Sequence, residues 1–302
     1  FQVFTPFYKA SEKISVEEPQ AAPKKMMRAD KPVSTLTIEN LSLLPKINWD
    51  KTMRNTWTPG ELQAEKSLKY FLQTKSSDYQ TQRDFPSVEG TSKLSPHLHF
   101  GEIGPRQIWH SALKEKKTDF YRREIVWREF AHHILFHFPQ TQDQPLRKNF
   151  EKFPWRNEDK ILSAWQRGET GIPIVDAGMK ELWQTGWMHN RVRMIVASFL
   201  TKHLLHSWLD GAKWFWETLV DADLANNSLG WQWAGGCGAD AAPYFRVFNP
   251  DLQAEKFDSA KVYIKRWNPD FDKPHYPRPI IDLKEGRERA LAAFDKIKTP
   301  SP

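Results

Sequence analysis

The amino-acid sequence predicts a mostly helical domain, and three observations support this prediction. From about residue 60 onward, apolar residues recur at helical spacing, glycine and proline separate long segments, and alternating β-branched runs are few. The 302 residues include 19 Phe, 14 Trp and 7 Tyr, which is enough apolar surface to build a sizeable core in one large domain or two small ones. A wholly disordered chain is therefore excluded.

Residues 1–45 are predicted to form an extended linker ahead of a helical domain at 46–302. The first fifty residues contain five prolines and no glycine, and they show no sustained helical periodicity. Phe1, Val3, Phe4 and Phe7 would make a poor free terminus, so the segment is expected to be the exit of another domain. It carries no secretory signal pattern.

The turn at 90–95, GTSKLS, offers hydroxyls, backbone N–H groups and a lysine, as a phosphate clamp needs. It lacks the order of glycines, lysine and hydroxyl found in a P-loop, so a nucleotide hydrolase is not supported. The glycines around Cys237 have no strand-turn-helix context for a dinucleotide fingerprint. His133 and His137 lack the glutamate of an HExxH zinc site and are expected to be packed or surface histidines.

Glu124, Trp127 and Arg128 share one face of a predicted helix, because they are three and four residues apart. One interpretation is a surface Glu–Arg pair, worth only a few tenths of a kcal/mol. The other is a carboxylate held beside a flat apolar ring. The sequence leaves both open.

Two helices follow in the middle of the chain. The first is predicted to start after Thr170, with Pro173 in its first turn, and to stop at Gly186. The second runs from about 187 to 206, and six apolar residues form a stripe that must face the core: Val192, Ile195, Val196, Phe199, Leu200 and Leu204.

Asn190 and Met194 then lie on the opposite side of this second helix, flanked by Arg191 and Arg193. An ordinary polar face with one stray methionine would explain this pattern. This segment alone favours that interpretation. The alternative is a cavity wall that offers an apolar surface, an amide and cations to a flat anionic ligand.

The stretch 221–233 places Asp221, Asp223 and two asparagines just before Trp231 and Trp233. Taken by itself, this stretch favours a pair of caps at helix ends for the two carboxylates.

Charge and cysteine content exclude several classes of protein. The net charge is +7, which suits phosphate-bearing partners and ordinary solubility alike. One cysteine, Cys237, excludes an intramolecular disulfide framework and a multi-cysteine zinc site, and it favours a reducing compartment. No apolar run approaches the length of a bilayer span, so an integral membrane protein is excluded.

Read together, four motifs resemble the photolyases and cryptochromes, specifically their C-terminal all-helical FAD-binding domain. They are GTSKLSPHLHFGEIGPRQ at 90–107, EIVWREF at 124–130, GETGIPIVDAGMKELWQTGWMHNRVRM at 168–194 and DADLANNSLGWQWAGGCGADAAPYFRVFNP at 221–250. The resemblance spans residues 46 to 270 in the family's order. It implies a noncovalent, reduced FAD in a folded conformation, and an N-terminal α/β antenna domain that this chain lacks, so no antenna chromophore is expected on it.

The resemblance also implies roles for individual residues. In the family, Arg193 and Asp221 form an ion pair near the flavin ring and Asn227 faces its N5 edge. The expected cofactor-binding residues are Tyr79, Thr91, Ser92, Lys93, Leu94, Ser95, Arg128, Asn190, Arg193, Asp221, Asp223 and Asn227. A tryptophan chain that re-reduces the flavin would comprise Trp155, Trp208 and Trp231. Tyr121 departs from the family, because many relatives have tryptophan there.

Asn190 and Met194 match the pattern of enzymes that split cyclobutane pyrimidine dimers, and the resemblance is nearest to their class I. It implies a light-driven carbon–carbon lyase in which excited, reduced FAD donates an electron to a flipped-out dimer. The residues expected to line the dimer pocket are Glu124, Trp127, Asn190, Arg191, Met194 and Trp233. A hydrogen bond from Glu124 to the dimer is expected.

The expected partner is UV-damaged DNA, bound by a monomer in the cytosol, or in the nucleus if the source is eukaryotic, with no membrane and no metal. Two alternatives remain open: a cryptochrome-like blue-light photoreceptor without repair activity, and a flavin-free nucleic-acid-binding module.

Overall fold

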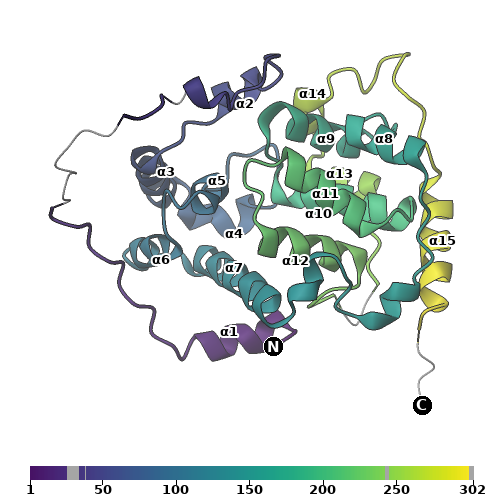
Figure 1. Ribbon diagram of the computed structural model, residues 1–302. Coiled ribbons are helices and arrows are strands. Elements are labelled where there is room, and N and C mark those ends of the chain that lie inside the picture. Colours follow the sequence, from purple (N-terminus) through teal and green to yellow (C-terminus); the bar gives the residue numbers. More distant parts are fainter. Residues whose placement is uncertain (26–33, 38, 242–244, 299–302) are drawn as a thin grey trace.

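The computed structural model describes residues 1–25, 34–37, 39–241 and 245–298. Across these ranges the chain is helical and contains no β-strand, which confirms the predicted class (Figure 1). The α-helices are α1 (Phe4–Ser11), α2 (Lys51–Thr56), α3 (Glu61–Thr74), α4 (Tyr79–Gln82), α5 (Ser95–His99), α6 (Pro105–Leu113), α7 (Asp119–His137), α8 (Asp159–Arg167), α9 (Pro173–Thr185), α10 (Asn190–Ser198), α11 (Trp208–Thr218), α12 (Leu224–Gly235), α13 (Pro250–Phe257), α14 (Val262–Trp267) and α15 (Leu283–Asp295).

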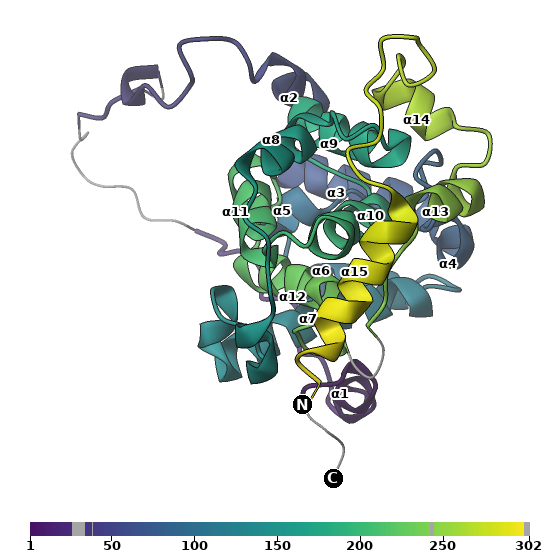
Figure 2. The same ribbon diagram turned by 90° about the vertical axis from the view of Figure 1, so that its right-hand side faces the viewer.

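The main apolar core lies where α9, α10, α11 and α12 pack together, with α15 laid along one side (Figure 2). A second core joins α3 and α6 to the first turns of α7, and a third lies between α1 and α7. Helix α7 contacts α1, α6 and α12, so it links the two smaller cores to the main one.

The N-terminal segment differs from the prediction of an extended linker. Residues 4–11 form helix α1, whose Phe4 is 1% exposed against α7. The described parts of residues 12–49 run outside the helical body, as Figure 1 shows, and are mostly exposed. The linker prediction was therefore wrong for residues 4–11, where an apolar contact stabilises a helix too short to persist alone.

Helix α9 confirms its predicted boundaries: Pro173 is its first residue, and Gly186 caps it with a left-handed φ of 67°. The next helix starts later than predicted. His189 is its N-cap and accepts a hydrogen bond from the Arg191 N–H at 3.2 Å, and α10 begins at Asn190. Beyond Ser198 the chain continues as a π-helical turn, Phe199–His203, instead of α-helix to 206. All six residues of the predicted apolar stripe are buried.

Among the described residues, no helix has both the length and the apolar character needed to cross a membrane. Within the same ranges, no group of three or more His, Cys, Asp or Glu side chains is arranged to hold a metal ion. His133 and His137 pack ring against ring, with centroids 4.5 Å apart.

Candidate functional site

A cavity of about 700 Å³ opens between α7, α10, α12 and the turn at 91–95. Most of the residues that the sequence singled out line it. On the expected cofactor side these are Tyr79, Thr91, Ser92, Lys93, Leu94, Ser95, Arg128, Arg193, Asp221, Asp223 and Asn227. On the expected substrate side they are Glu124, Trp127, Asn190, Arg191, Met194 and Trp233.

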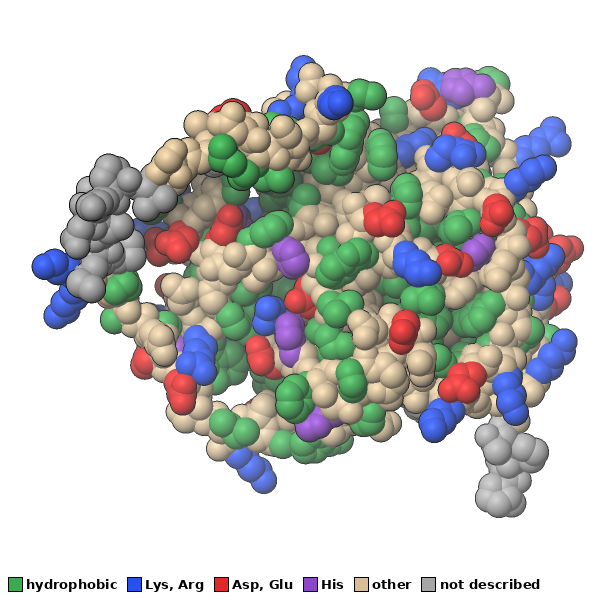
Figure 3. All heavy atoms as spheres, viewed as in Figure 1, with side chains coloured by type: hydrophobic (Ala, Val, Ile, Leu, Met, Phe, Trp, Pro, Cys, Tyr) green, Lys and Arg blue, Asp and Glu red, His purple; other side chains and the backbone are tan. Residues whose placement is uncertain are grey.

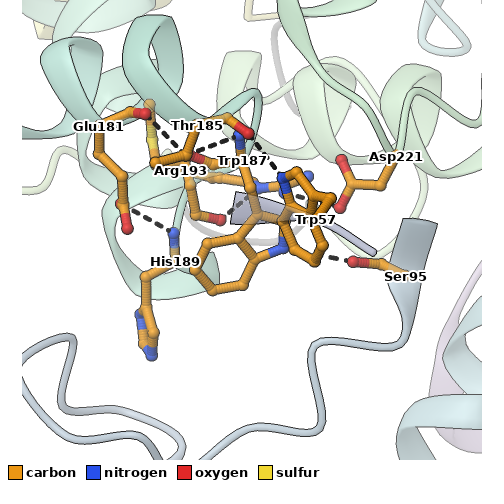
Figure 4. Close-up of polar contacts among 9 residues, drawn as sticks. Trp57, Ser95, Glu181, Thr185, Trp187, His189, Arg193 and Asp221 are labelled. Carbon is orange, nitrogen blue, oxygen red and sulfur yellow. Dashed lines mark hydrogen bonds and ion pairs between the residues drawn. The ribbon is translucent and has the colours of Figure 1, made fainter. Parts of the chain in front are cut away.

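The turn at 91–95 forms one wall of this cavity. Lys93 adopts a left-handed φ of 51°, and its ammonium lies 5.5 Å from the centre of the Trp187 ring. The Ser95 hydroxyl, at the start of α5, accepts a hydrogen bond from the Trp187 indole N–H at 3.3 Å (Figure 4). The clamp predicted from GTSKLS is therefore joined to the loop that precedes α10.

Two tyrosines, Tyr79 and Tyr121, also line the cavity. The Tyr79 and Tyr121 rings meet edge to face, 5.3 Å apart, and both are buried. Burial raises the pKa of the Tyr121 phenol to about 12 and also raises that of Tyr79. Both phenols are therefore neutral at physiological pH.

The loop at 185–189 is held by a network that Figure 4 shows. The Trp57 indole donates to the Thr185 carbonyl at 2.7 Å. The Glu181 carboxyl accepts from the His189 backbone N–H at 3.2 Å and from the Tyr263 hydroxyl at 2.5 Å. Burial raises the pKa of Glu181 to about 7. These contacts fix the entry to α10 and therefore the direction of its polar face.

Arg193 and Asp221 form the ion pair that the resemblance implied. Arg193 Nη2 lies 2.8 Å from Asp221 Oδ2, and Arg193 Nε donates to the Met188 carbonyl at 2.7 Å (Figure 4). The Asp221 side chain is 3% exposed, and its other oxygen, Oδ1, is buried without a hydrogen-bond partner in the described structure. The cavity wall thus offers an unused acceptor beside a guanidinium.

Asp221 and Asp223 do not both cap helices. Asp223 is the N-cap of α12 and accepts from the Asn226 N–H at 2.8 Å, whereas Asp221 takes part in the ion pair. Burial opposes ionisation of Asp223, but hydrogen bonds from His132 and Asn226 outweigh it and hold the pKa of Asp223 well below its usual value. Next along the helix, Asn227 donates to the Ala212 carbonyl at 2.9 Å, which orients its amide.

Glu124 pairs across the cavity wall, not along its own helix. Its carboxylate accepts a hydrogen bond from Arg83, whereas Arg128 lies 3.7 Å from Glu129. The Glu124–Arg128 pair considered from the sequence is therefore wrong. Although burial lowers the pKa of Arg83, the contact with Glu124 outweighs it and raises that pKa. Sequence reasoning missed Arg83, because 41 residues separate it from Glu124.

Asn190 and Met194 project together from α10, as the helical spacing predicts. Asn190 is exposed and Met194 half-buried, and Asn190 Nδ2 lies 3.9 Å from Met194 Sδ. Beside them, Arg191 forms an ion pair with Asp84 at 2.6 Å, and its guanidinium lies 4.3 Å from the centre of the Phe257 ring. These side chains line the wall of the cavity, and the flat anionic ligand expected there stays a prediction.

Several lining residues were not predicted individually: Arg83, Asp84, Trp187, Met188, Asn226 and Arg246. Trp187 and Met188 could have been found from their place directly before Asn190. Arg246 lies 5.8 Å from the centre of the Trp233 ring and adds a cation to the substrate side.

The three tryptophans of the expected electron-transfer chain lie in or against the main core. Trp231 is buried, lines the cavity and packs edge to face on Phe215 at 4.9 Å. Trp208 is buried in the same apolar cluster. Trp155 is half-buried and packs on Phe153 at 4.4 Å. Electron transfer through the three stays a prediction.

Basic and acidic side chains are interspersed over the face shown in Figure 3, so the net charge of +7 is not gathered on that face. The cations of interest are instead those of the cavity and its rim: Lys93, Arg128, Arg191, Arg193 and Arg246.

Comparison with known proteins gives consistent results. The family model for the FAD-binding domain of DNA photolyase matches residues 120–274. Deoxyribodipyrimidine photo-lyase from Agrobacterium fabrum is 45% identical, over 99% of this chain and 69% of that protein. A bacterial class III photolyase from Agrobacterium tumefaciens superposes with a TM-score of 0.91 at 44% identity, covering 98% of this chain and 68% of the other. A cryptochrome from Synechocystis superposes with a TM-score of 0.87 at 29% identity, covering 97% and 68%.

Proposed function

The chain belongs to the DNA photolyase family, and from this we propose that it uses FAD and light to split cyclobutane pyrimidine dimers in DNA. The observation that carries the proposal is the composition of one cavity. The Arg193–Asp221 pair, the turn at 91–95 and the Asn190–Met194 edge of α10 all line it.

The residues present fit FAD. A volume of about 700 Å³ is within the range of cofactor sites. The unpartnered Asp221 Oδ1 is a buried acceptor that awaits a donor, and the flavin ring and ribityl chain both carry donors. Lys93 and the hydroxyls of the turn at 91–95 provide a cation and donors for the pyrophosphate.

When bound and reduced, FAD supplies the light-absorbing electron donor. The residues of the chain hold and orient the cofactor and the substrate and exclude water from the cavity. Arg193 places a fixed positive charge on the cofactor side, where it favours an anionic ring. Asn227, with its amide fixed by the Ala212 carbonyl, presents a polar group to the same side.

On the substrate side, Trp127 and Trp233 offer flat apolar surfaces for an everted pyrimidine pair. A dimer stacks poorly in duplex DNA, so its extrusion costs less than that of intact bases. Arg191 and Arg246 supply cations to the phosphates that flank it.

The expected role of Glu124 changes with the structure. Its carboxylate accepts from Arg83, so it can donate to a dimer carbonyl only after taking up a proton. In the arrangement seen here, the Arg83 guanidinium is the group of this pair that carries N–H donors for the dimer. Both groups can therefore stabilise negative charge on the substrate, by different means.

Asn190 and Met194 support a cyclobutane dimer as the lesion. The resemblance pointed to class I, whereas the 44% identical neighbour is a class III photolyase, which favours class III for this chain.

Illumination of the FAD-loaded, reduced protein with an oligonucleotide that carries one thymine dimer tests the proposal. We expect dimers to be lost in the light and retained in the dark. Glu124→Gln should lower the yield about tenfold or more, because it removes the charge that fixes Arg83. Glu65→Gln, at an exposed position on α3, is the matched control and should repair normally. Unchanged dimer content with FAD bound would contradict repair.

The Synechocystis cryptochrome has the same fold, so a photoreceptor without repair activity is the alternative. It predicts flavin photochemistry in the protein, unchanged dimer content, and equal behaviour of the Glu124→Gln and Glu65→Gln variants.

A further inference from the structure

Helix α1 packs directly behind a residue of the cavity wall. The Phe4 ring lies parallel to the Trp127 ring, with centroids 3.7 Å apart and planes 7° from each other. Phe130 meets the Trp127 ring edge to face at 5.7 Å, and it meets Phe4 at the same distance. Trp127 is therefore held on one face and one edge, while it remains half-buried and lines the cavity.

The Phe4 ring is itself fixed from further groups. The Arg123 guanidinium lies 5.3 Å from its centre, and Phe4 is 1% exposed. Trp127, Phe130 and Arg123, which all contact Phe4, belong to α7, and α1 lies beside that helix in Figure 1. Helix α1 is thus packed firmly against α7.

Residues 2–4 also contact Asp240, a second residue that lines the cavity. Asp240 donates its backbone N–H to the Gln2 carbonyl at 3.0 Å, and its carboxylate accepts the Phe4 backbone N–H at 3.1 Å. Asp240 has a left-handed φ of 56°, which is unfavourable for a residue with a side chain unless its surroundings hold it there. Residues 2–4 therefore join α7 to the loop after α12.

We propose that Phe4 is a positioning residue for substrate recognition: its ring fixes the orientation of Trp127, on which the everted dimer stacks. The inference rests on the proposed function. A tryptophan held in its bound orientation loses less side-chain freedom when the dimer arrives, so part of the cost of ordering is met before binding. The Phe4–Trp127 stack is present before and after binding, so its contribution to dimer affinity is the side-chain freedom that Trp127 no longer has to lose.

Phe7 is a control that distinguishes positioning of Trp127 from simple packing of α1. It belongs to the same helix and contacts Phe130 at 5.2 Å and His133 at 5.1 Å. A purely structural role for α1 would make Phe4 and Phe7 equivalent in their effect on DNA binding.

The test measures binding in the dark by fluorescence anisotropy, with FAD-loaded protein and oligonucleotides with and without one thymine dimer. Phe4→Leu keeps apolar volume but removes the flat ring. We expect it to raise the Kd for dimer DNA about fivefold, which is about 1 kcal/mol, and to change the Kd for undamaged DNA less than twofold. Phe4→Tyr should restore dimer affinity, and Phe7→Leu should leave it unchanged.

Each other outcome has a distinct meaning. Equal dimer affinity in Phe4→Leu and Phe7→Leu would overturn the inference, as would an equal loss for damaged and undamaged DNA. If Phe4→Leu does not fold, Phe4→Met takes its place under the same criteria. A wild-type protein that binds FAD but does not prefer dimer DNA would instead contradict the proposed function.

Discussion

Replacement of Arg193 by methionine tests whether the ion pair beside the cavity is as costly to break as its burial implies. Arg193 Nη2 lies 2.8 Å from an Asp221 carboxylate that is 3% exposed, and Oδ1 of that carboxylate already lacks a partner. Removal of one member of a buried pair costs about 3–5 kcal/mol, because the other charge is left uncompensated. Since the Arg193 side chain is 25% exposed, water replaces part of the contact, and we expect about 3 kcal/mol.

The assay is urea unfolding of the FAD-free protein, followed by circular dichroism. Arg167→Met is the matched control, because Arg167 and Glu169 are also 2.8 Å apart but are 60% and 50% exposed. Breaking that surface pair should cost at most about 1 kcal/mol. Arg193→Met should in addition weaken FAD binding, measured by flavin fluorescence, whereas Arg167→Met should not.

Equal losses of stability in the two variants would refute the reasoning, since it would show that burial adds nothing to the cost of the broken pair. Unchanged FAD affinity in a destabilised Arg193→Met variant would leave the energetic argument standing but would remove Arg193 from the cofactor side.

Two further predictions concern packing and pH. A Cβ at Gly211 would lie 2.1 Å from the Trp231 ring, so Gly211→Ala should destabilise the protein by about 1–3 kcal/mol in thermal unfolding. Gly230 lies in α12 with open space around it, so Gly230→Ala should instead stabilise the protein by up to about 1 kcal/mol. Equal effects of the two would contradict the packing argument. The raised pKa of Glu181, about 7 against an ordinary 4.5, means that the folded state holds this proton more tightly than the unfolded chain, so its contribution to stability falls as pH rises between those values. The free energy of unfolding of Glu181→Gln, relative to that of wild type, should therefore rise by about 3 kcal/mol between about pH 4 and about pH 8. The measurement is urea unfolding at both pH values, and a difference between the two proteins that does not change with pH would contradict this.

Periodic features of the sequence predicted structure well, because in a regular helix the spacing between residues determines which side of the helix each one faces. The stripe from Val192 to Leu204 determined which side of α10 faces the core, and so placed Asn190 and Met194 on the cavity. The change to a π-helical turn at Phe199 was not predictable, because the apolar spacing of the stripe continues unchanged through this turn.

Features that depend on distant segments could not be predicted. Helix α1 is eight residues long, contains Pro6 and is stabilised by the contact of Phe4 with α7, which no local pattern records. Likewise, spacing favoured Arg128 as the partner of Glu124, and only the fold brings Arg83 to it. The positions of the site residues followed from motifs, but their pairing followed from tertiary structure.

Helix α10 is only nine residues long, yet Asn190, Arg193 and Met194 all line the cavity from it, and Arg193 also pairs with Asp221. Because Arg193 and Met194 lie three and four positions after Asn190, the backbone of the helix itself sets the spacing between these residues. Under the proposed function, one short backbone segment therefore spaces residues expected at the cofactor from residues expected at the substrate, and a reaction whose rate depends steeply on separation gains from that fixed spacing.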